Sequence, residues 1–156
     1  MKLSIRILAL SVIILSGFGL SAQDKMKYNI DNSNIALQGY SPVSYLDLGL
    51  AQRGSKEYKS EYDKVIYYFT SEQQKRTFDA DPEKYLPQYG GFCAFGIYAG
   101  AKFRPDPNKF IVKDGKYFLF LYNIELDAQQ LWLDKTHDNL VKKADKNWVG
   151  LKQTFN

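Results

Sequence analysis

The hydrophobic pattern in the middle of the chain predicts one strand and one hairpin. Val65–Phe69 is a run of β-branched and aromatic residues bounded by polar ones, which is typical of a strand. Two further β-rich runs, Lys109–Lys113 and Lys116–Tyr122, are separated by Asp114 and Gly115. A type I′ turn needs positive φ at both central positions, so Asp-Gly between two such runs indicates an antiparallel hairpin.

A helix is expected directly after the first strand. Ser71 can act as its N-cap, and Gln74 stands three residues later, as in a capping box. Phe78 supplies an apolar position, and the helix should end near Asp81 because a proline disfavours α conformation in the residue before it. Pro82–Tyr85 then opens a second short helical turn, with proline at its first position.

The C-terminal part of the chain has the spacing of a helical face. Its apolar positions recur so that they share one side of a helix. They are Leu126, Leu133, His137, Leu140, Val141, Ala144 and Trp148. The pattern leaves open whether one helix or two cover this span.

Two glycine-containing segments are harder to assign. Tyr89–Gly100 is apolar, aromatic and uncharged, and we favour a short buried helix opened by Gly90 and Gly91 over a strand. A glycine and a proline divide Ile35–Leu46 into short pieces, which we expect to be extended. Together the elements predict an α+β fold in a single domain, with a small antiparallel sheet and helices packed on one of its faces.

The N-terminus has the layout of a secretory signal peptide. Lys2 and Arg6 make a basic start, Ile7–Leu20 is apolar, and small residues follow up to Ala22. The apolar stretch is shorter than the roughly 20 residues of a membrane-spanning helix, which favours cleavage after Ala22 over an uncleaved anchor. We therefore expect export to the periplasm or the cell exterior, with a signal peptide over 1–22, a flexible lead-in over 23–34 and the domain over 35–152.

Composition narrows the classes of partner and chemistry. Without Lys2 and Arg6 the chain holds 19 basic and 17 acidic residues, and this near balance leads us to expect no nucleic-acid partner. No segment after the leader is long and apolar enough to cross a membrane. Cys93 is the only cysteine, so the chain forms no internal disulfide, and a lone thiol in an exported protein is either buried or used chemically.

Several motifs, taken in order, resemble the YHS domain family. The motifs of its first half are Gly39–Tyr45, Tyr68–Phe78 and Asp81–Tyr85. Longer exported members resemble this chain further, in Tyr89–Phe95, Lys113–Leu119 and Lys143–Trp148, so that the likeness spans about Ile35–Leu151. The resemblance implies a metal-associated domain, because related domains occur in copper-transporting ATPases and other heavy-metal proteins, where cysteines are thought to hold the ion.

The chain departs from this family pattern at the metal-holding positions. Where the family places its thiols, this sequence has Ser44, Thr70 and Gln74, and none of these is a soft ligand. Metal binding through that cluster therefore does not transfer to this chain. Only a different thiol, Cys93, remains, in the tract that the exported members share.

Cys93 and His137 are the candidate metal ligands. Together they can supply two ligands to copper or zinc, and His137 is the only histidine. The alternative is a packed cysteine and a histidine held by one hydrogen bond. A catalytic Cys–His pair is disfavoured, because an apolar tract does not stabilise a thiolate.

A second kind of site is an aromatic pocket for a small molecule. Its candidate residues are Tyr40, Tyr45, Tyr89, Gly90 and Gly91. Each tyrosine can equally be an ordinary core residue with its hydroxyl near the surface. We predict an exported, non-enzymatic binding domain that takes a transition metal such as copper or zinc through Cys93. The alternative is a small-molecule or protein-interaction module in which Cys93 is only structural.

Overall fold

The first hairpin consists of β1 (Ser55–Tyr62) and β2 (Val65–Phe69) in a computed structural model that describes residues 27–154. β2 is the predicted strand. Its side chains alternate between buried and half-buried, so Val65, Tyr67 and Phe69 face the core. The two strands form one antiparallel sheet that has no hydrogen-bonded link to a third strand in the described part of the chain.

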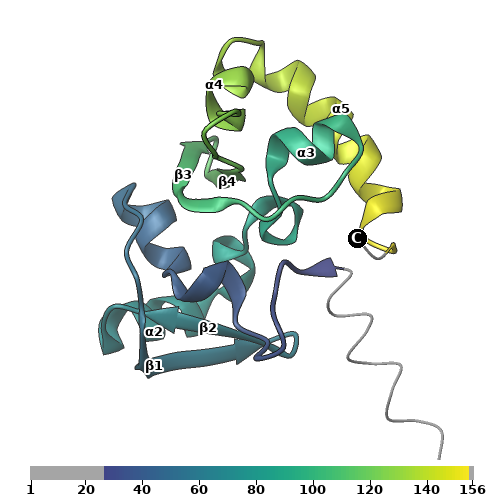
Figure 1. Cartoon of the computed structure of the whole chain (residues 1–156). Helices are drawn as coiled ribbons and strands as arrows, with labels where there is room; N and C mark the ends of the chain where they lie inside the picture. Colours follow the sequence, from purple (N-terminus) through teal and green to yellow (C-terminus); the bar gives the residue numbers. More distant parts are fainter. Residues whose placement is uncertain (1–26, 155–156) are drawn as a thin grey trace, which may run out of the picture.

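The predicted helix after β2 is α2 (Glu72–Ala80), which packs beside this hairpin (Figure 1). Ser71 Oγ accepts a hydrogen bond from the Gln74 N–H, at 3.3 Å, which confirms the N-cap. The side chain of Gln74 does not complete the capping box and points instead to other polar groups. The helix ends before Asp81, and the turn η3 (Pro82–Tyr85) follows as predicted.

The second hairpin joins β3 (Asp106–Lys113) to β4 (Lys116–Phe120). Asp114 has a φ of 53° and Gly115 a φ of 70°, so both turn residues are left-handed, as the Asp-Gly pair predicts. The α+β class is confirmed, but the strands form two separate two-stranded sheets rather than one. The reason is local, because helical turns occupy most of the chain between β2 and β3 and leave no strand to join the hairpins.

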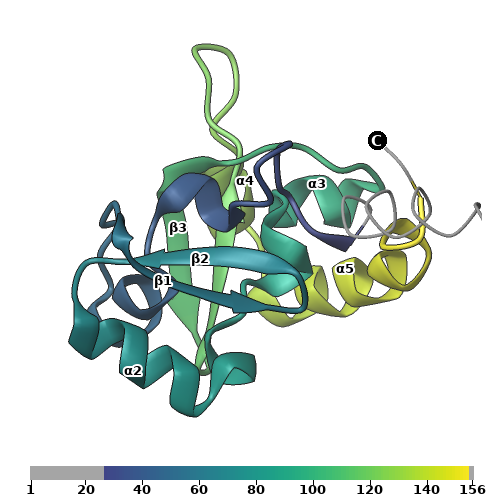
Figure 2. The ribbon, with the colours of Figure 1, turned by 90° about the horizontal axis from the view of Figure 1, so that it is seen from below.

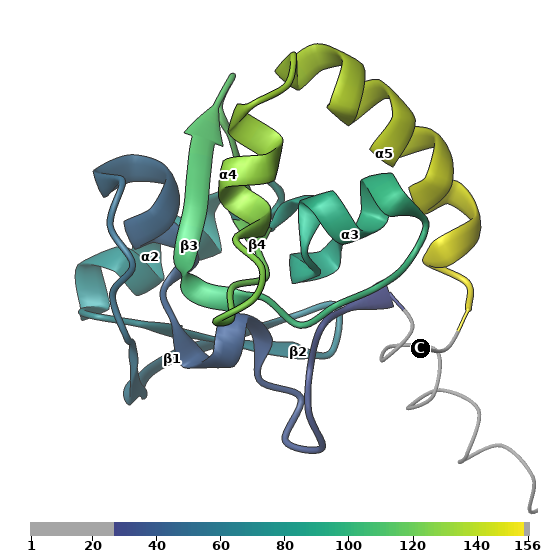
Figure 3. The same cartoon turned by 45° about the horizontal axis from the view of Figure 1, so that its top comes forward.

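Two helices, not one, follow the second hairpin. They are α4 (Ala128–Leu133) and α5 (His137–Leu151), and α5 runs beside the short α3 (Ala94–Ala99) at the same end of the molecule (Figures 2 and 3). Because the helix is interrupted between α4 and α5, the predicted apolar face does not continue through Leu133, which is 56% exposed. Trp132 takes the buried position instead and is 1% exposed.

The segment expected to be extended, Ile35–Leu46, is mostly made of tight helical turns. These are η1 (Ala36–Gly39), a 3-10 turn, and η2 (Ser44–Leu48), a π-helical turn. Leu37 and Gln38 lie in the left-handed region, with φ of 54° and 55°. Non-glycine residues adopt this conformation only where tertiary contacts impose it, so the hydrophobic pattern gave no sign of it. A similar turn, η4 (Gln88–Gly91), precedes α3.

The buried side chains form two clusters, and β4 contributes to both, with Tyr117 and Leu119 in the first and Phe118 and Phe120 in the second. The first gathers aromatic residues around β2 and α2, including Tyr67, Phe69 and Phe78. The second gathers α3, β4, α4 and α5 around residues such as Phe118 and Trp132. The site described below lies at the edge of this second cluster.

Tyr28 shows that the packed domain begins before residue 35. It is 5% exposed and belongs to the first buried cluster, and its neighbour Asn29 donates a backbone hydrogen bond to the Gly90 carbonyl at 2.9 Å. Within the predicted lead-in, Tyr28 therefore packs against the domain, whereas Lys27 and Asp31–Ser33 are exposed. The predicted signal peptide lies outside the described residues, and within 27–154 no helix has both the length and the apolarity of a membrane span.

Candidate functional site

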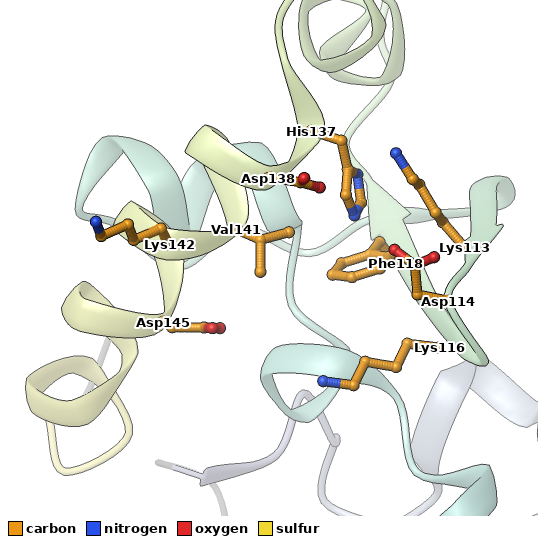
Figure 4. A pocket seen from close by; sticks show the side chains of 9 residues that line it. All are labelled: Lys113, Asp114, Lys116, Phe118, His137, Asp138, Val141, Lys142 and Asp145. Atoms are coloured by element: carbon orange, nitrogen blue, oxygen red, sulfur yellow. The ribbon is translucent and has the colours of Figure 1, made fainter.

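A cleft of about 440 Å³ opens between the tip of the second hairpin and the first half of α5 (Figure 4). Its walls carry three lysines, three aspartates, one histidine and two apolar side chains. The lining residues are Lys113, Asp114, Lys116, Phe118, His137, Asp138, Val141, Lys142 and Asp145. The opposite charges are balanced, so the cleft as a whole does not select for one sign of ligand.

Three possible metal ligands converge in this cleft. His137 and Asp138 are the first residues of α5, and Asp114 lies in the hairpin turn. One ligand atom from each lies within 4.8 Å of the other two. The left-handed turn positions Asp114 against the helix start, so two elements far apart in the sequence contribute to one cluster.

Trp132 fixes the orientation and the tautomer of the His137 ring. Its Nε1–H donates a hydrogen bond to His137 Nδ1 at 3.0 Å, and the two rings meet edge to face with their centroids 5.6 Å apart. Because Nδ1 uses its lone pair to accept this bond, the neutral ring carries its proton on Nε2. Phe118 packs against the same ring, with a centroid distance of 5.1 Å.

The surroundings of His137 keep its ring neutral. Burial lowers the pKa of His137 below its usual 6.5, and the positive charge of Lys113 lowers it further. Asp138 and Asp114 act in the opposite direction, but they are exposed and their effect is smaller. A neutral imidazole is the form that binds metal ions.

Cys93 lies in a different environment from His137. It is 1% exposed, and its Sγ accepts backbone hydrogen bonds from Gly96 at 3.4 Å and from Leu121 at 3.2 Å. The thiol therefore caps α3 and ties it to the end of β4. Burial raises the pKa of the Cys93 thiol, which the backbone N–H groups oppose only in part, so the thiolate is disfavoured.

The two predicted metal ligands are thus not brought together as one cluster. Among the residues that the structure describes, the group of three candidate ligands contains His137 but not Cys93. The sequence did not identify Asp114 or Asp138 as partners of His137. The Asp-Gly turn signal located Asp114 at a hairpin tip, but nothing in the sequence placed that tip next to the start of α5.

The small-molecule candidates are also dispersed. Tyr45 is fully buried and donates its hydroxyl to the Pro107 carbonyl at 2.7 Å, so it is a core residue. Tyr89 and Gly90 line a separate cavity of about 290 Å³. A Cβ on Gly90 would lie 1.9 Å from the Lys27 carbonyl oxygen, so the close approach that this glycine allows is to the chain itself.

The other two small-molecule candidates have protein partners as well. Tyr40 is half-buried beneath the guanidinium of Arg53, whose carbon lies 6.0 Å from the ring centroid. Gly91 has a φ of 84° and accepts a hydrogen bond from the Asn29 side chain at 3.1 Å. The five residues therefore do not line one common pocket.

The three positions that correspond to the family's thiols do meet in space. Gln74 Oε1 accepts a hydrogen bond from the Thr70 N–H at 3.2 Å, and Gln74 Nε2 donates to Ser44 Oγ at 2.9 Å. Ser41 Oγ also donates to Gln74 Oε1, at 2.7 Å. These hydroxyl and amide groups satisfy one another and offer no soft ligand, so they do not fit a thiophilic metal ion.

Comparison with known proteins does not identify a function for the chain. The resemblance to the YHS domain stays a prediction from the motifs, and the identity of the ligand has to be argued from the residues of the cleft. No family model, no curated protein and no solved structure matches the chain.

Proposed function

We propose that the chain is an exported, non-enzymatic binding module that takes a divalent transition metal, zinc foremost, at His137, Asp114 and Asp138. The convergence of these three side chains from two elements carries the proposal. One imidazole nitrogen and two carboxylate oxygens form a donor set that suits zinc and its neighbours, whereas Cu(I) prefers sulfur ligands. The predicted role of Cys93 as a ligand is replaced by a structural one.

Within a cleft of balanced charge, the two aspartates of the cluster favour a cation. Asp114 and Asp138 are exposed and appear in none of the ion pairs of the described residues. Two carboxylates within 4.8 Å of each other repel, and a divalent ion between them relieves this repulsion. Their ligand atoms need only a small inward movement to reach the spacing of a zinc coordination sphere.

The hydrogen bond from Trp132 to His137 lowers the expected affinity for a metal ion. A metal ion at Nε2 displaces the proton there, and a neutral ring then carries its proton on Nδ1, which no longer accepts from Trp132. Leaving this buried donor unpaired costs about 1–3 kcal/mol, which corresponds to roughly one to two powers of ten in affinity. We therefore expect binding of moderate strength that weakens as the pH falls and His137 becomes protonated.

Zinc titration calorimetry of the protein purified from its own compartment tests the proposal. His137→Gln and Asp138→Asn are each expected to weaken zinc binding at least tenfold, because each removes a ligand. Asp134→Asn is the matched control: it makes the same charge change three residues before His137, on a side chain outside the cluster. It should bind zinc like the parent protein.

Two further variants separate the possible outcomes. Trp132→Phe removes the indole donor and should raise zinc affinity, provided that circular dichroism shows a folded protein. Cys93→Ser should leave zinc affinity unchanged. Loss of binding in Cys93→Ser alone, or equal binding by the parent and His137→Gln, would show that the metal site is not in this cleft.

A further inference from the structure

A third cavity, of about 570 Å³, lies where η1, the start of β1 and the segment before β3 meet. Its lining includes Arg53, Lys56 and Arg104, and the only acidic residue among the lining residues is Asp31. Tyr68 of β2 forms part of its wall. No residue of this cavity belongs to the His137 cleft, so a ligand bound here is independent of the proposed function.

Within residues 27–154, the three cations of this cavity form no ion pair. None of them donates a side-chain hydrogen bond among the residues that the structure describes. Arg53 rests over the Tyr40 ring, which leaves the guanidinium N–H groups available. Asp31 keeps its negative charge, so the lining has a net charge of +2, and its carboxylate accepts the Ser33 N–H at 2.8 Å. The hydrogen bonds from Ser33, and to a smaller extent the charge of Arg104, lower the pKa of Asp31.

The cavity is built by close backbone contacts rather than left by loose packing. A Cβ on Gly54 would lie 2.5 Å from the Tyr68 carbonyl carbon, so only glycine lets this segment reach β2. The Gly54 N–H donates to the Gly39 carbonyl at 2.8 Å, which holds η1 beside the same segment.

The third segment is fixed by Gln38. Its side chain donates to the Pro105 carbonyl at 2.8 Å and so holds the neighbouring Arg104 near η1. Gln38 and Leu37 keep left-handed φ values of 55° and 54°, a conformation that costs free energy for both residue types. Strained backbone of this kind gathers at functional sites, and here it shapes the wall that faces the arginines.

We propose that this cavity binds a small organic anion that carries two or more negative charges as phosphate or carboxylate groups. A guanidinium donates two parallel hydrogen bonds to either group, so Arg53 and Arg104 can each hold one. Lys56 adds a third positive charge. The Tyr68 ring offers an apolar surface to the body of the ligand.

Isothermal titration of the purified full chain with pyrophosphate and, separately, with citrate tests this site. The double variant Arg53→Gln/Arg104→Gln should weaken binding of the preferred anion at least tenfold. Arg76→Gln is the control for a change of charge elsewhere: it removes one positive charge, against two in the double variant, on the exposed face of α2, outside the cavity. Pyrophosphate binding alone would identify phosphate as the recognised group, and citrate binding alone would identify carboxylate.

Three further outcomes would overturn the proposed anion site. Binding that survives in the double variant, or that falls equally in Arg76→Gln, would overturn the proposal by showing an unspecific effect of charge. Absence of binding of both anions to the parent protein would overturn it as well. His137→Gln should bind the anion like the parent, which keeps this test separate from that of the metal cleft.

Discussion

The buried polar network around Gln74 and the open cleft around His137 use similar side chains in opposite ways. In the network, Ser41 and Ser44 are fully buried, and their hydroxyl groups are paired with Gln74 and Gln52. In the cleft, Asp114 and Asp138 are exposed, and His137 has one ring nitrogen paired with Trp132. The network has no capacity left for a ligand, whereas the cleft does.

This difference separates stability from binding in the molecule. A closed network of hydrogen bonds holds elements together and costs free energy when one member is lost. A partly solvated cluster contributes little to stability but keeps its donors and acceptors available. Cys93 belongs with the first class, because its thiol already serves two backbone N–H groups. Variants in the two regions should therefore change different measurements.

The largest effect on stability is expected for Gln74→Leu. This change keeps a side chain of similar size but leaves the Thr70 N–H and the Ser41 hydroxyl without their acceptor. It should lower the free energy of unfolding by about 3 kcal/mol in urea titration, without changing zinc affinity. Gln73→Leu, on the exposed side of α2, is the control and should change stability by about 0.5 kcal/mol or less. Equal effects of the two variants would contradict the structural role of the network.

The second-largest effect on stability is expected for Cys93→Ala. It leaves the Gly96 and Leu121 N–H groups unpaired and creates a small cavity, so unfolding free energy should fall by about 2 kcal/mol. Cys93→Ser should cost less, because a hydroxyl oxygen accepts the same two N–H groups. Thermal melts of the three proteins give the order. If the serine variant were less stable than the alanine variant, the thiol would not act as a cap.

Gly115→Val tests how the hairpin turn supports the cleft. Valine resists the φ of 70° at this position, so the variant should lose about 1 kcal/mol of stability. The same change displaces Asp114 and should weaken zinc binding, so this variant is expected to affect both measurements. Gly150→Val in α5 is the control, since Gly150 is exposed and has no positive φ. Unchanged zinc affinity in Gly115→Val would remove Asp114 from the proposed ligand set.

The sequence predicted the secondary-structure elements that are determined by neighbouring residues. The strand Val65–Phe69, the cap at Ser71 and the turn at Asp114 follow from residue types within a few positions of one another. The left-handed backbone of Leu37 depends instead on contacts from distant segments, so no local pattern indicates it.

The same limit applies to the cleft. His137 was singled out as the only histidine, but its meeting with Asp114 depends on how α5 packs against the second hairpin. The burial of Trp132 in place of the predicted Leu133 has a similar origin. Three non-helical residues separate α4 from α5, so the apolar positions of the two helices do not lie on one continuous face.

The smallest expected effect is the dependence of stability on the charge of His137. Burial and Lys113 hold the pKa of this ring below 6.5, so the unfolded chain binds the proton more tightly than the folded protein does. Above about pH 6.5 both states hold a neutral ring, and this histidine adds no pH dependence. As the pH falls below that value, the unfolded chain is protonated first, and the stability contributed by the neutral ring is lost until the folded protein is protonated as well. Protonation at Nδ1 also takes away the acceptor of the Trp132 N–H.

His137→Gln isolates this effect. Free energies of unfolding of parent and variant, measured from pH 7.5 to 5, should converge as the pH falls, because the variant lacks the group that titrates. The aspartates with lowered pKa values, such as Asp63 and Asp127, act below this range and cancel in the difference between the two proteins. A saturating amount of zinc should enlarge the pH dependence of the parent alone, since the metal and the proton compete for the same ring. If the curves of parent and variant ran parallel without zinc, the charge of His137 would not affect stability. If they also ran parallel with zinc, His137 would not bind the ion.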